Sequence, residues 1–226
     1  MITVSKEDYL KAILEAEAEG ENVISATLAH WLSVSAPAVT MALRRLKRDG
    51  LVTVRPDGRV ELTRAGREVA RRTALRHHLI ERMLHEVFGM EWYRVHDEAE
   101  RLEHAVSADF ERKLIRKIGR GGVCPHGNPV IPETPQARRR RGQRLLAEAE
   151  DGKGYSVASV YERDARLQEF LDQRGLRPGA RLRVVSRSYD QTLTLDTGAG
   201  RFTIGAPAAE KVWVAVAHDG AGRKHS

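Results

Sequence analysis

The sequence has a single cysteine, few aromatic residues and no long apolar run. One cysteine in 226 residues cannot form an internal disulfide, which predicts a protein of the reducing cytoplasm rather than a secreted one. No apolar run approaches the roughly 20 residues that a membrane-spanning helix needs, so we expect no membrane partner. Lys6, Glu7 and Asp8 interrupt the N-terminus before an apolar segment develops, and this pattern is not that of a signal peptide.

The composition is typical of a globular protein that binds a polyanion. Hydrophobic residues make up 41% of the chain and charged residues 31%, and the length predicts two or three small domains, because domains commonly run to about 100–150 residues. The formal net charge is +7 and the pI is about 9.8. This charge favours nucleic acid as a partner over acidic proteins or membranes.

One short stretch near the middle of the chain has the pattern of a metal-ligand set. On an α-helix, positions i, i+4, i+7 and i+8 form one stripe, and here they carry His96, Glu100, Glu103 and His104. The alternative is a solvated helix face with i,i+4 charge pairs. Three further features favour the metal site, namely Asp8 on an amphipathic segment, the i,i+4 pair His77 and Glu81, and the loop Cys124-Pro125-His126.

A segment near the N-terminus has the pattern of a winged helix-turn-helix. A short helix is expected over 24–32 and a second over 35–50, which starts with Ser35 as its N-cap. Alternating residues at 51–54 and 60–62 predict the two strands of a hairpin. A helix-turn-helix followed directly by a small hairpin is a winged helix.

The outward residues of the second helix and of the hairpin tip are candidates for contact with DNA. Basic side chains there would reach phosphates, and small or apolar ones would face base edges. The candidate DNA-binding residues are Ser35, Pro37, Ala38, Thr40, Met41, Arg44, Lys47, Arg48, Arg55 and Arg59. The alternative, a winged helix used only for protein contacts, is disfavoured by these outward basic residues.

The rest of the chain predicts a helical module and then a small β-barrel. A long helix is expected from Thr63 to Gly89 and another from Ser107 to Ile118; with the polar stripe between them they would form a dimerisation module. The basic run 138–141 is expected to be a solvated linker or, failing that, an auxiliary DNA contact. The alternating segments expected to be barrel strands lie at 155–160, 182–185, 192–195, 202–204 and 212–216.

The order of winged helix, helical dimerisation module and small barrel, together with several motifs, points to a known family. The motifs are Glu7-Asp8-Tyr9-Leu10, Ser35-Ala36-Pro37, Arg48-Asp49-Gly50-Leu51-Val52, Val95-His96-Asp97-Glu98-Ala99-Glu100 and Glu103-His104. Over nearly its whole length the chain resembles the diphtheria-toxin-repressor family of metal-dependent transcriptional regulators. The resemblance implies a mainly α fold with a small β domain, in five parts: a winged-helix DNA-binding domain (1–72), a helical dimerisation and metal-binding domain (73–137), a linker (138–150), an SH3-like domain (151–220) and a tail (221–226).

The resemblance implies a homodimer that binds double-stranded operator DNA when metal is bound. Its metal site near the DNA-binding domain would take Asp8, Glu100, Glu103 and His104. Iron-responsive members have methionine and cysteine where this chain has Asp8 and Glu100, whereas manganese-responsive members have carboxylates. Hard carboxylate oxygens suit Mn²⁺, so we expect Mn²⁺, with Fe²⁺ as the alternative and other divalent metals able to bind in vitro.

The family's two-metal cluster does not transfer to this sequence. Small manganese regulators have a glutamate one turn after the position of Asp8, where Lys11 stands here. Longer members resemble this chain in a second site, which would take Glu81, Cys124, His126 and a barrel carboxylate, Asp164. Iron-responsive members fill roughly the same place with residues matching His77, Glu81 and His96. Which of these six bind together is left open by the sequence.

Other functional classes are weaker expectations. A metal-dependent hydrolase would need an open coordination position and a general base in a cleft, and a winged helix tied to the cluster has no role in hydrolysis. A metal-independent DNA-binding protein, with the stripe as charged surface, is a further alternative. We therefore expect a transcriptional repressor rather than an enzyme, with no small-molecule substrate.

Overall fold

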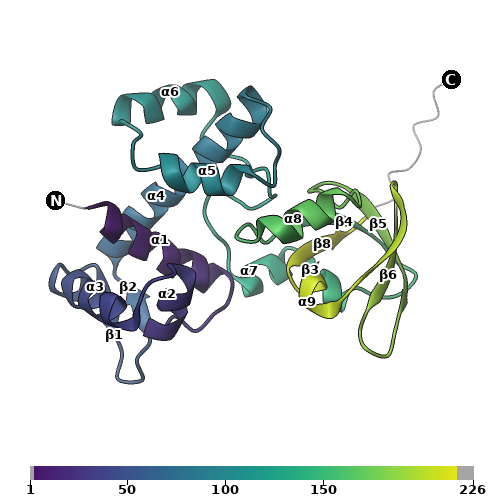
Figure 1. Ribbon diagram of the computed structural model, residues 1–226, viewed down its shortest axis with the longest axis horizontal. Helices are drawn as coiled ribbons and strands as arrows, with labels where there is room; N and C mark the ends of the chain where they lie inside the picture. The colour runs from purple at the N-terminus through teal and green to yellow at the C-terminus, as the bar shows by residue number, and fades with distance from the viewer. Residues whose placement is uncertain (1–2, 218–226) are drawn as a thin grey trace. The chain divides into compact units, whose positions relative to one another are not determined.

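A computed structural model describes residues 3–217, and the chain folds into two compact units. Unit 1 comprises residues up to Met90, Asp97–Cys124 and Pro129–Ala137. Unit 2 comprises Glu91–His96, Pro125–Asn128 and the chain from Arg138 onward. Figure 1 labels most of the elements of both units. The tail expected after residue 220 lies outside the described residues.

The winged helix predicted from the sequence is confirmed. Its elements are α1 (Val4–Ala18), α2 (Ser25–Trp31), α3 (Ala36–Arg48), β1 (Val52–Val54) and β2 (Val60–Leu62), with the two strands paired antiparallel. Ser35 caps α3 as expected, because its Oγ accepts a hydrogen bond from the Ala38 N–H at 3.4 Å. The apolar residues of α3 at helical spacing, Val39, Leu43 and Leu46, are all buried.

A long helix joins the winged helix to the rest of unit 1. Thr63, where the long helix was expected to begin, caps α4 (Arg64–Arg82), and the helix continues as the π-helical turn η1 (Met83–Val87). The N-terminal half of α4 packs on α1 and its C-terminal half on α6 (Ala108–Ile118). The expected domain boundary at residue 72 therefore falls inside a continuous helix, and most of the two expected domains belongs to unit 1, with Glu91–His96 and Pro125–Asn128 in unit 2.

Close packing between α4 and the winged helix depends on one glycine. A Cβ at Gly66 would lie 1.9 Å from the carbonyl oxygen of Leu51, which no side chain tolerates. The start of α4 can therefore approach the chain just before β1 only without a side chain at this position. Thr63 reinforces the contact, since its hydroxyl donates a hydrogen bond to the Gly50 oxygen at 2.7 Å.

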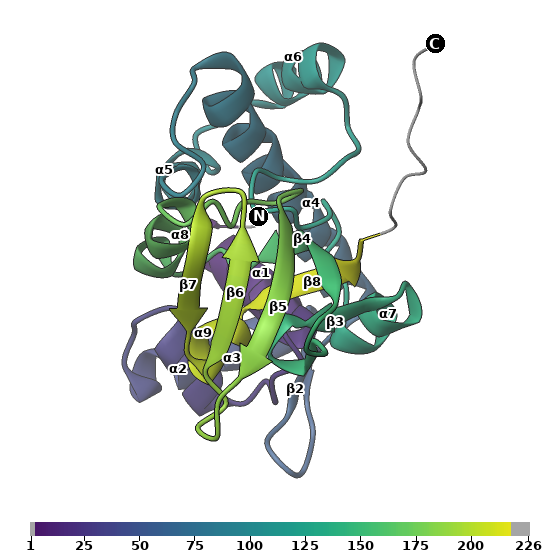
Figure 2. The same ribbon diagram turned by 90° about the vertical axis from the view of Figure 1, so that its right-hand side faces the viewer.

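Unit 2 is the small β domain predicted from the sequence. Its six-stranded antiparallel sheet has the order β3-β8-β4-β5-β6-β7, part of which faces the viewer in Figure 2. The elements are β3 (Gln143–Leu145), η2 (Leu146–Glu148), β4 (Gly154–Val160), α8 (Ala165–Asp172), β5 (Arg181–Arg187), β6 (Leu193–Thr197), β7 (Gly200–Ile204), α9 (Ala206–Ala209) and β8 (Val212–Val216). Inward residues such as Tyr155, Val157, Leu195 and Val214 form its core.

The segment 138–150, expected to be a linker, is instead part of the β domain. Its strand β3 pairs with β8, and the helix α7 (Pro135–Arg140) precedes it. Arg138 is buried rather than solvated, because its guanidinium donates to the Ser159 hydroxyl at 2.6 Å and lies 5.2 Å from the Trp213 ring centroid. A buried arginine held by a hydrogen bond and a ring has a structural role.

No single helix in residues 3–217 is long and apolar enough to cross a membrane. Only α2 and α3 taken together reach the required length and composition, and the pair is bent by 111°.

Candidate metal centre

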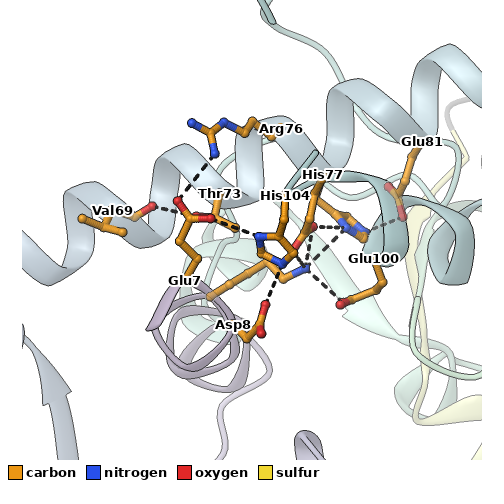
Figure 3. Close-up of polar contacts among 11 residues, drawn as sticks. Glu7, Asp8, Val69, Thr73, Arg76, His77, Glu81, Glu100 and His104 are labelled. Carbon is orange, nitrogen blue, oxygen red and sulfur yellow. Dashed lines mark hydrogen bonds and ion pairs between the residues drawn. The ribbon is translucent and has the colours of Figure 1, made fainter. Parts of the chain in front are cut away.

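Three of the predicted ligands meet within unit 1. Asp8 extends from α1, and Glu103 and His104 lie in the turn that follows α5 (Val95–Leu102), so that one ligand atom of each lies within 4.8 Å of the others. The His104 Nε2 atom is 2.7 Å from the Asp8 Oδ1 atom and 3.3 Å from the Glu103 Oε1 atom. Figure 3 shows Asp8 and His104 directed at each other from their separate elements. We name Asp8, Glu103 and His104 the first cluster.

The predicted helical stripe is only partly correct. Helix α5 ends at Leu102, and a single 2.9 Å hydrogen bond from the Glu103 N–H to the Ala99 oxygen extends it by one residue. The turn carries His104 away from the helix axis and toward α1, where a straight helix would have kept it on the stripe. Glu100 lies on α5 and is bonded to a lysine instead of joining the first cluster.

Glu7, which the sequence pattern did not single out as a site residue, fixes the imidazole of His104. Its Oε2 atom lies 3.0 Å from the His104 Nδ1 atom, on the opposite side of the ring from Asp8. Its other oxygen lies 3.5 Å from the Arg76 guanidinium. A carboxylate on one imidazole nitrogen orients the ring and leaves the other nitrogen for a metal, as is usual for metal-bound histidines. The sequence feature that could have identified Glu7 is its position next to Asp8 on the same helix.

Lys11 is buried beside the first cluster. Its side chain stands one turn after Asp8 on α1, and the residue is 2% exposed. The ammonium donates to both carboxylate oxygens of Glu103 at 2.7 Å and to Glu100 Oε1 at 3.0 Å. The sequence placed a lysine here but gave no sign that it would be buried among carboxylates.

The electrostatics of the first cluster follow from burial and from these cations. Burial raises the pKa of Asp8, and the charge of His104 opposes this only in part. Burial alone would raise the pKa of Glu103, but the hydrogen bond from His77 and the charge of Lys11 outweigh it and lower the pKa. Glu103 is therefore an ionised carboxylate at neutral pH, as a metal ligand must be.

His77 joins the first cluster to a neighbouring group of potential ligands. Its Nδ1 atom lies 2.7 Å from Glu103 and its Nε2 atom 3.0 Å from Glu81. Burial and the charge of Lys11 lower the pKa of His77, but Glu81 and the hydrogen bond with Glu103 outweigh them and raise it to about 10. Glu81 in turn lies within 4.8 Å, ligand atom to ligand atom, of His78 and Cys124.

We name His78, Glu81 and Cys124 the second cluster. All three side chains are buried in unit 1. Glu81 and Cys124 were predicted to act together, whereas His78 was not, although its i,i+3 spacing from Glu81 on α4 was a usable signal. An imidazole, a carboxylate and a thiolate suit zinc and other late divalent metals.

The other expected ligands of the second site belong to unit 2. His96 and His126 are buried there with their ring centroids 6.2 Å apart. The expected role of Asp164 is not supported, because its carboxylate caps α8 by accepting from the Leu167 N–H at 3.0 Å and pairs with Lys211 at 3.1 Å. Although burial alone would raise the pKa of Asp164, these contacts outweigh it and lower the pKa.

The candidate DNA-binding residues of α3 all lie on its exposed side. Burial follows the predicted pattern, and the exposed set comprises Ser35, Pro37, Ala38, Thr40, Met41, Arg44, Lys47 and Arg48. The last turn of α3 is basic, with Arg45, Lys47 and Arg48. This helix therefore presents small and apolar groups at one end and cations at the other.

The two arginines of the hairpin are exposed but paired with acids. Arg55 lies 2.5 Å from Glu61, and Arg59 lies 2.7 Å from Asp57. Exposed pairs of this kind contribute little to stability and exchange readily for another anion. Their contact with a DNA phosphate would therefore require only that the side chains turn away from their present partners.

The first cluster fits a divalent cation by its donors. The carboxylates of Asp8 and Glu103 converge with the His104 imidazole, and Glu103 is fully buried. Glu7 contacts the other ring nitrogen of His104 and orients the imidazole. Oxygen-rich sets of this kind suit hard divalent ions such as Mn²⁺.

Family models for three successive domains match the chain. Residues 1–60 match the iron dependent repressor N-terminal DNA binding domain, and residues 63–132 match the iron dependent repressor metal binding and dimerisation domain. Residues 144–216 match the FeoA domain. The order of these matches agrees with the winged helix, the helical segment and the β domain.

Individual relatives agree with the family models. The chain is 32% identical over 220 residues to the iron-dependent repressor IdeR of Mycobacterium leprae, an alignment that covers 92% of this chain and 95% of that protein. It is 40% identical to the Mycobacterium tuberculosis IdeR (strain ATCC 25618 / H37Rv) over 124 residues, which span 55% of this chain and only about half, 54%, of that relative.

Solved structures of metal-dependent repressors are also similar to this chain. A manganese-dependent transcriptional repressor in complex with manganese has a TM-score of 0.82 and 32% identity, over 94% of this chain and 100% of the other. The regulator ScaR with bound Zn²⁺ has a TM-score of 0.76 and 27% identity, over 94% and 99%. The fold, the converging ligands and these similarities together show that the chain belongs to the diphtheria-toxin-repressor family of metal-dependent transcriptional repressors.

Proposed function

We propose that this protein is a manganese-dependent repressor that binds operator DNA as a homodimer and controls genes of metal uptake. The observation that supports this best is the first cluster itself. It draws one ligand from α1 of the winged helix and two from the turn after α5, in the segment that matches a metal binding and dimerisation domain. Metal binding and the position of the DNA-binding helices are thereby coupled.

Manganese is proposed over iron because of the donor atoms. Asp8 and Glu103 contribute carboxylate oxygens where a softer metal would favour sulfur. The structural relatives include a repressor solved with manganese, whereas the Mycobacterium leprae relative found by sequence is named iron-dependent. Iron is therefore the alternative, and titration with each metal distinguishes the two.

The proposed mechanism gives each side chain a role. A divalent cation, when bound, supplies the positive charge that joins α1 to the turn after α5. Asp8 connects that charge to the winged helix, Glu103 connects it to the helical segment, and Glu7 holds the His104 ring in place. Fixing α1 fixes α3, because the two helices share a core that includes Leu10 and Leu43. Both α3 helices of a dimer would then reach successive major grooves.

Exposed apolar side chains in the helical segment support the homodimer. Val87, Phe88 and Phe110 are 51%, 69% and 42% exposed, and they lie in the segment that matches the dimerisation domain. Large apolar side chains rarely stay in water when a partner surface is available.

We propose a regulatory role without catalysis, since the groups of the first cluster all have a task in binding or positioning.

The first experiment measures binding to the DNA upstream of the protein's own gene by fluorescence anisotropy, with Mn²⁺, with anaerobic Fe²⁺ and with chelator. Tight binding with micromolar Mn²⁺ and weak binding in chelator are expected. Activation by Fe²⁺ at lower concentration would favour the iron alternative. Equal binding in chelator would contradict metal dependence.

The Asp8→Ala variant tests the coupling directly. It removes the only first-cluster ligand that comes from α1. Metal-dependent DNA binding should fall at least about tenfold, as for loss of one contact worth about 1.4 kcal/mol, while the dimer persists in sedimentation. Normal metal-dependent binding by this variant would show that the bridge through Asp8 is wrong.

A further inference from the structure

The ammonium of Lys11 occupies a place that suits a metal ion. It lies 2.7 Å from each carboxylate oxygen of Glu103 and 3.0 Å from Glu100, and it is 3.4 Å from the His77 Nδ1 atom. Lys11 is 2% exposed and Glu103 is fully buried. Burying an ammonium or a carboxylate alone is strongly unfavourable, so the pairing of Lys11 with Glu103 stabilises both charges in the metal-free protein.

The lysine and the first cluster share one ligand. The Glu103 Oε1 atom that accepts from Lys11 also lies 3.3 Å from His104 Nε2, the same nitrogen that Asp8 approaches. A divalent cation bound there would therefore stand close to the Lys11 ammonium. Two positive charges a few ångströms apart in a buried site repel strongly.

We propose that Lys11 is an internal competitor for the metal. Its ammonium holds Glu103 and Glu100 while the site is metal-free, and a divalent cation binds at the first cluster only by displacing it. The competition weakens metal affinity and so sets the metal concentration at which the protein responds. This inference rests on the proposed function, because it takes the first cluster as the metal site.

Glu15 gives the displaced ammonium an alternative partner. It is largely buried, and it stands one turn beyond Lys11 on the same face of α1. Burial lowers the pKa of Lys11, but the charges of Glu15, Glu103 and Glu100 outweigh it and raise the pKa. An ammonium that turned toward Glu15 would leave Glu103 available and still have an acidic partner.

The test compares Lys11→Met with Lys6→Met, a matched control on the same helix whose lysine pairs with Asp49 at 2.6 Å nearer the surface. Both are made in a Cys124→Ala background, which removes the thiol of the second cluster. Mn²⁺ affinity is measured by electron paramagnetic resonance, and stability by thermal unfolding with chelator and with saturating Mn²⁺.

Lys11→Met should bind Mn²⁺ about tenfold more tightly than its parent, because the competing charge is gone. Its metal-free unfolding temperature should fall by roughly 10 °C, because Glu103 loses the Lys11 ammonium and keeps only His77 as a cationic partner, and saturating Mn²⁺ should restore most of the loss. Lys6→Met should change neither value appreciably. A drop in stability with unchanged or weaker Mn²⁺ affinity would overturn the proposal and leave Lys11 a purely structural residue.

Two further variants cover a failure of Lys11→Met to fold. Lys11→Gln has a shorter but polar side chain that keeps N–H donors and removes the positive charge, so it should also bind Mn²⁺ more tightly. Lys11→Arg keeps the positive charge, so its Mn²⁺ affinity should not increase. Equal Mn²⁺ affinities in the Lys11→Gln and Lys11→Arg variants would also overturn the proposal. If Asp8→Ala in the same background binds Mn²⁺ as well as its parent, the first cluster is not the metal site and the proposed function fails, whatever the Lys11 variants show.

Discussion

At the residue scale, His104 is held by carboxylates at both ring nitrogens. Asp8 lies at Nε2 and Glu7 at Nδ1, at 2.7 and 3.0 Å. The two acids are neighbours on α1 but have different tasks, since Asp8 faces the proposed metal position and Glu7 lies behind the ring. A hydrogen bond to the far nitrogen makes the near nitrogen a better and better-aligned ligand.

Replacing Glu7 by glutamine should therefore weaken Mn²⁺ binding about tenfold, the lower end of the effect usual for a partner behind a metal ligand. Isothermal titration calorimetry measures the affinity, and circular dichroism checks that the fold is kept. Glu17→Gln is the control, because Glu17 is also on α1 but pairs with Arg67, outside the first cluster. Equal affinities in the two variants would show that Glu7 does not orient His104.

At the element scale, α3 combines two kinds of exposed surface. Its first turns expose Pro37, Ala38 and Met41, and its last turn carries Lys47 and Arg48. The buried residues between them fix the helix to the winged-helix core, so the exposed side is presented as a rigid strip. Cations supply affinity for any DNA, and we expect the small and apolar side chains to face the bases.

Each cation that contacts a phosphate should account for about one unit of salt dependence. Lys47→Ala should weaken binding to operator and to unrelated DNA alike, and it should reduce the slope of log K against log salt by about one. Met41→Ala should reduce the preference for the operator and leave the slope unchanged. Lys113→Ala on α6 is a control for loss of charge alone, because Lys113 pairs with Asp109 within that helix. A slope that stays the same in Lys47→Ala would remove Lys47 from the interface.

At the scale of the whole molecule, the two units have separate cores. Leu10 and Leu28 belong to the core of unit 1, and Tyr155, Leu171 and Val214 belong to that of unit 2. The first cluster lies entirely in unit 1. Ligand binding stabilises the part of a protein that holds the ligand.

Metal removal should therefore destabilise unit 1 more than unit 2. At a Mn²⁺ concentration about 100 times the Kd, the gain for the unit that binds it is about 2.7 kcal/mol. Hydrogen exchange with Mn²⁺ and with chelator should show the largest change in protection in α1 and α5, and a small change in β5 and β6. A uniform change, or one confined to the β domain, would contradict this placement of the metal site.

The sequence by itself determined the elements and much of the ligand set. The cap expected at Ser35 acts locally and is confirmed, and Thr63 and Ser107 cap α4 and α6 by the same short-range hydrogen bond. The alternating strands and the winged helix follow equally from short-range periodicity. Asp8, Glu103 and His104 were identified because their residue types and motifs are read directly from the chain.

Only the tertiary structure decided how distant residues meet. Burial of Lys11 against Glu103, 92 positions away, depends on how α1 packs beside the turn after α5. The same holds for Glu7 behind His104, for His78 in the second cluster and for Arg138 over Trp213. Local periodicity places a side chain on a face of its own element, but the charge or ring it meets across the core is set by packing between elements, which no local pattern records.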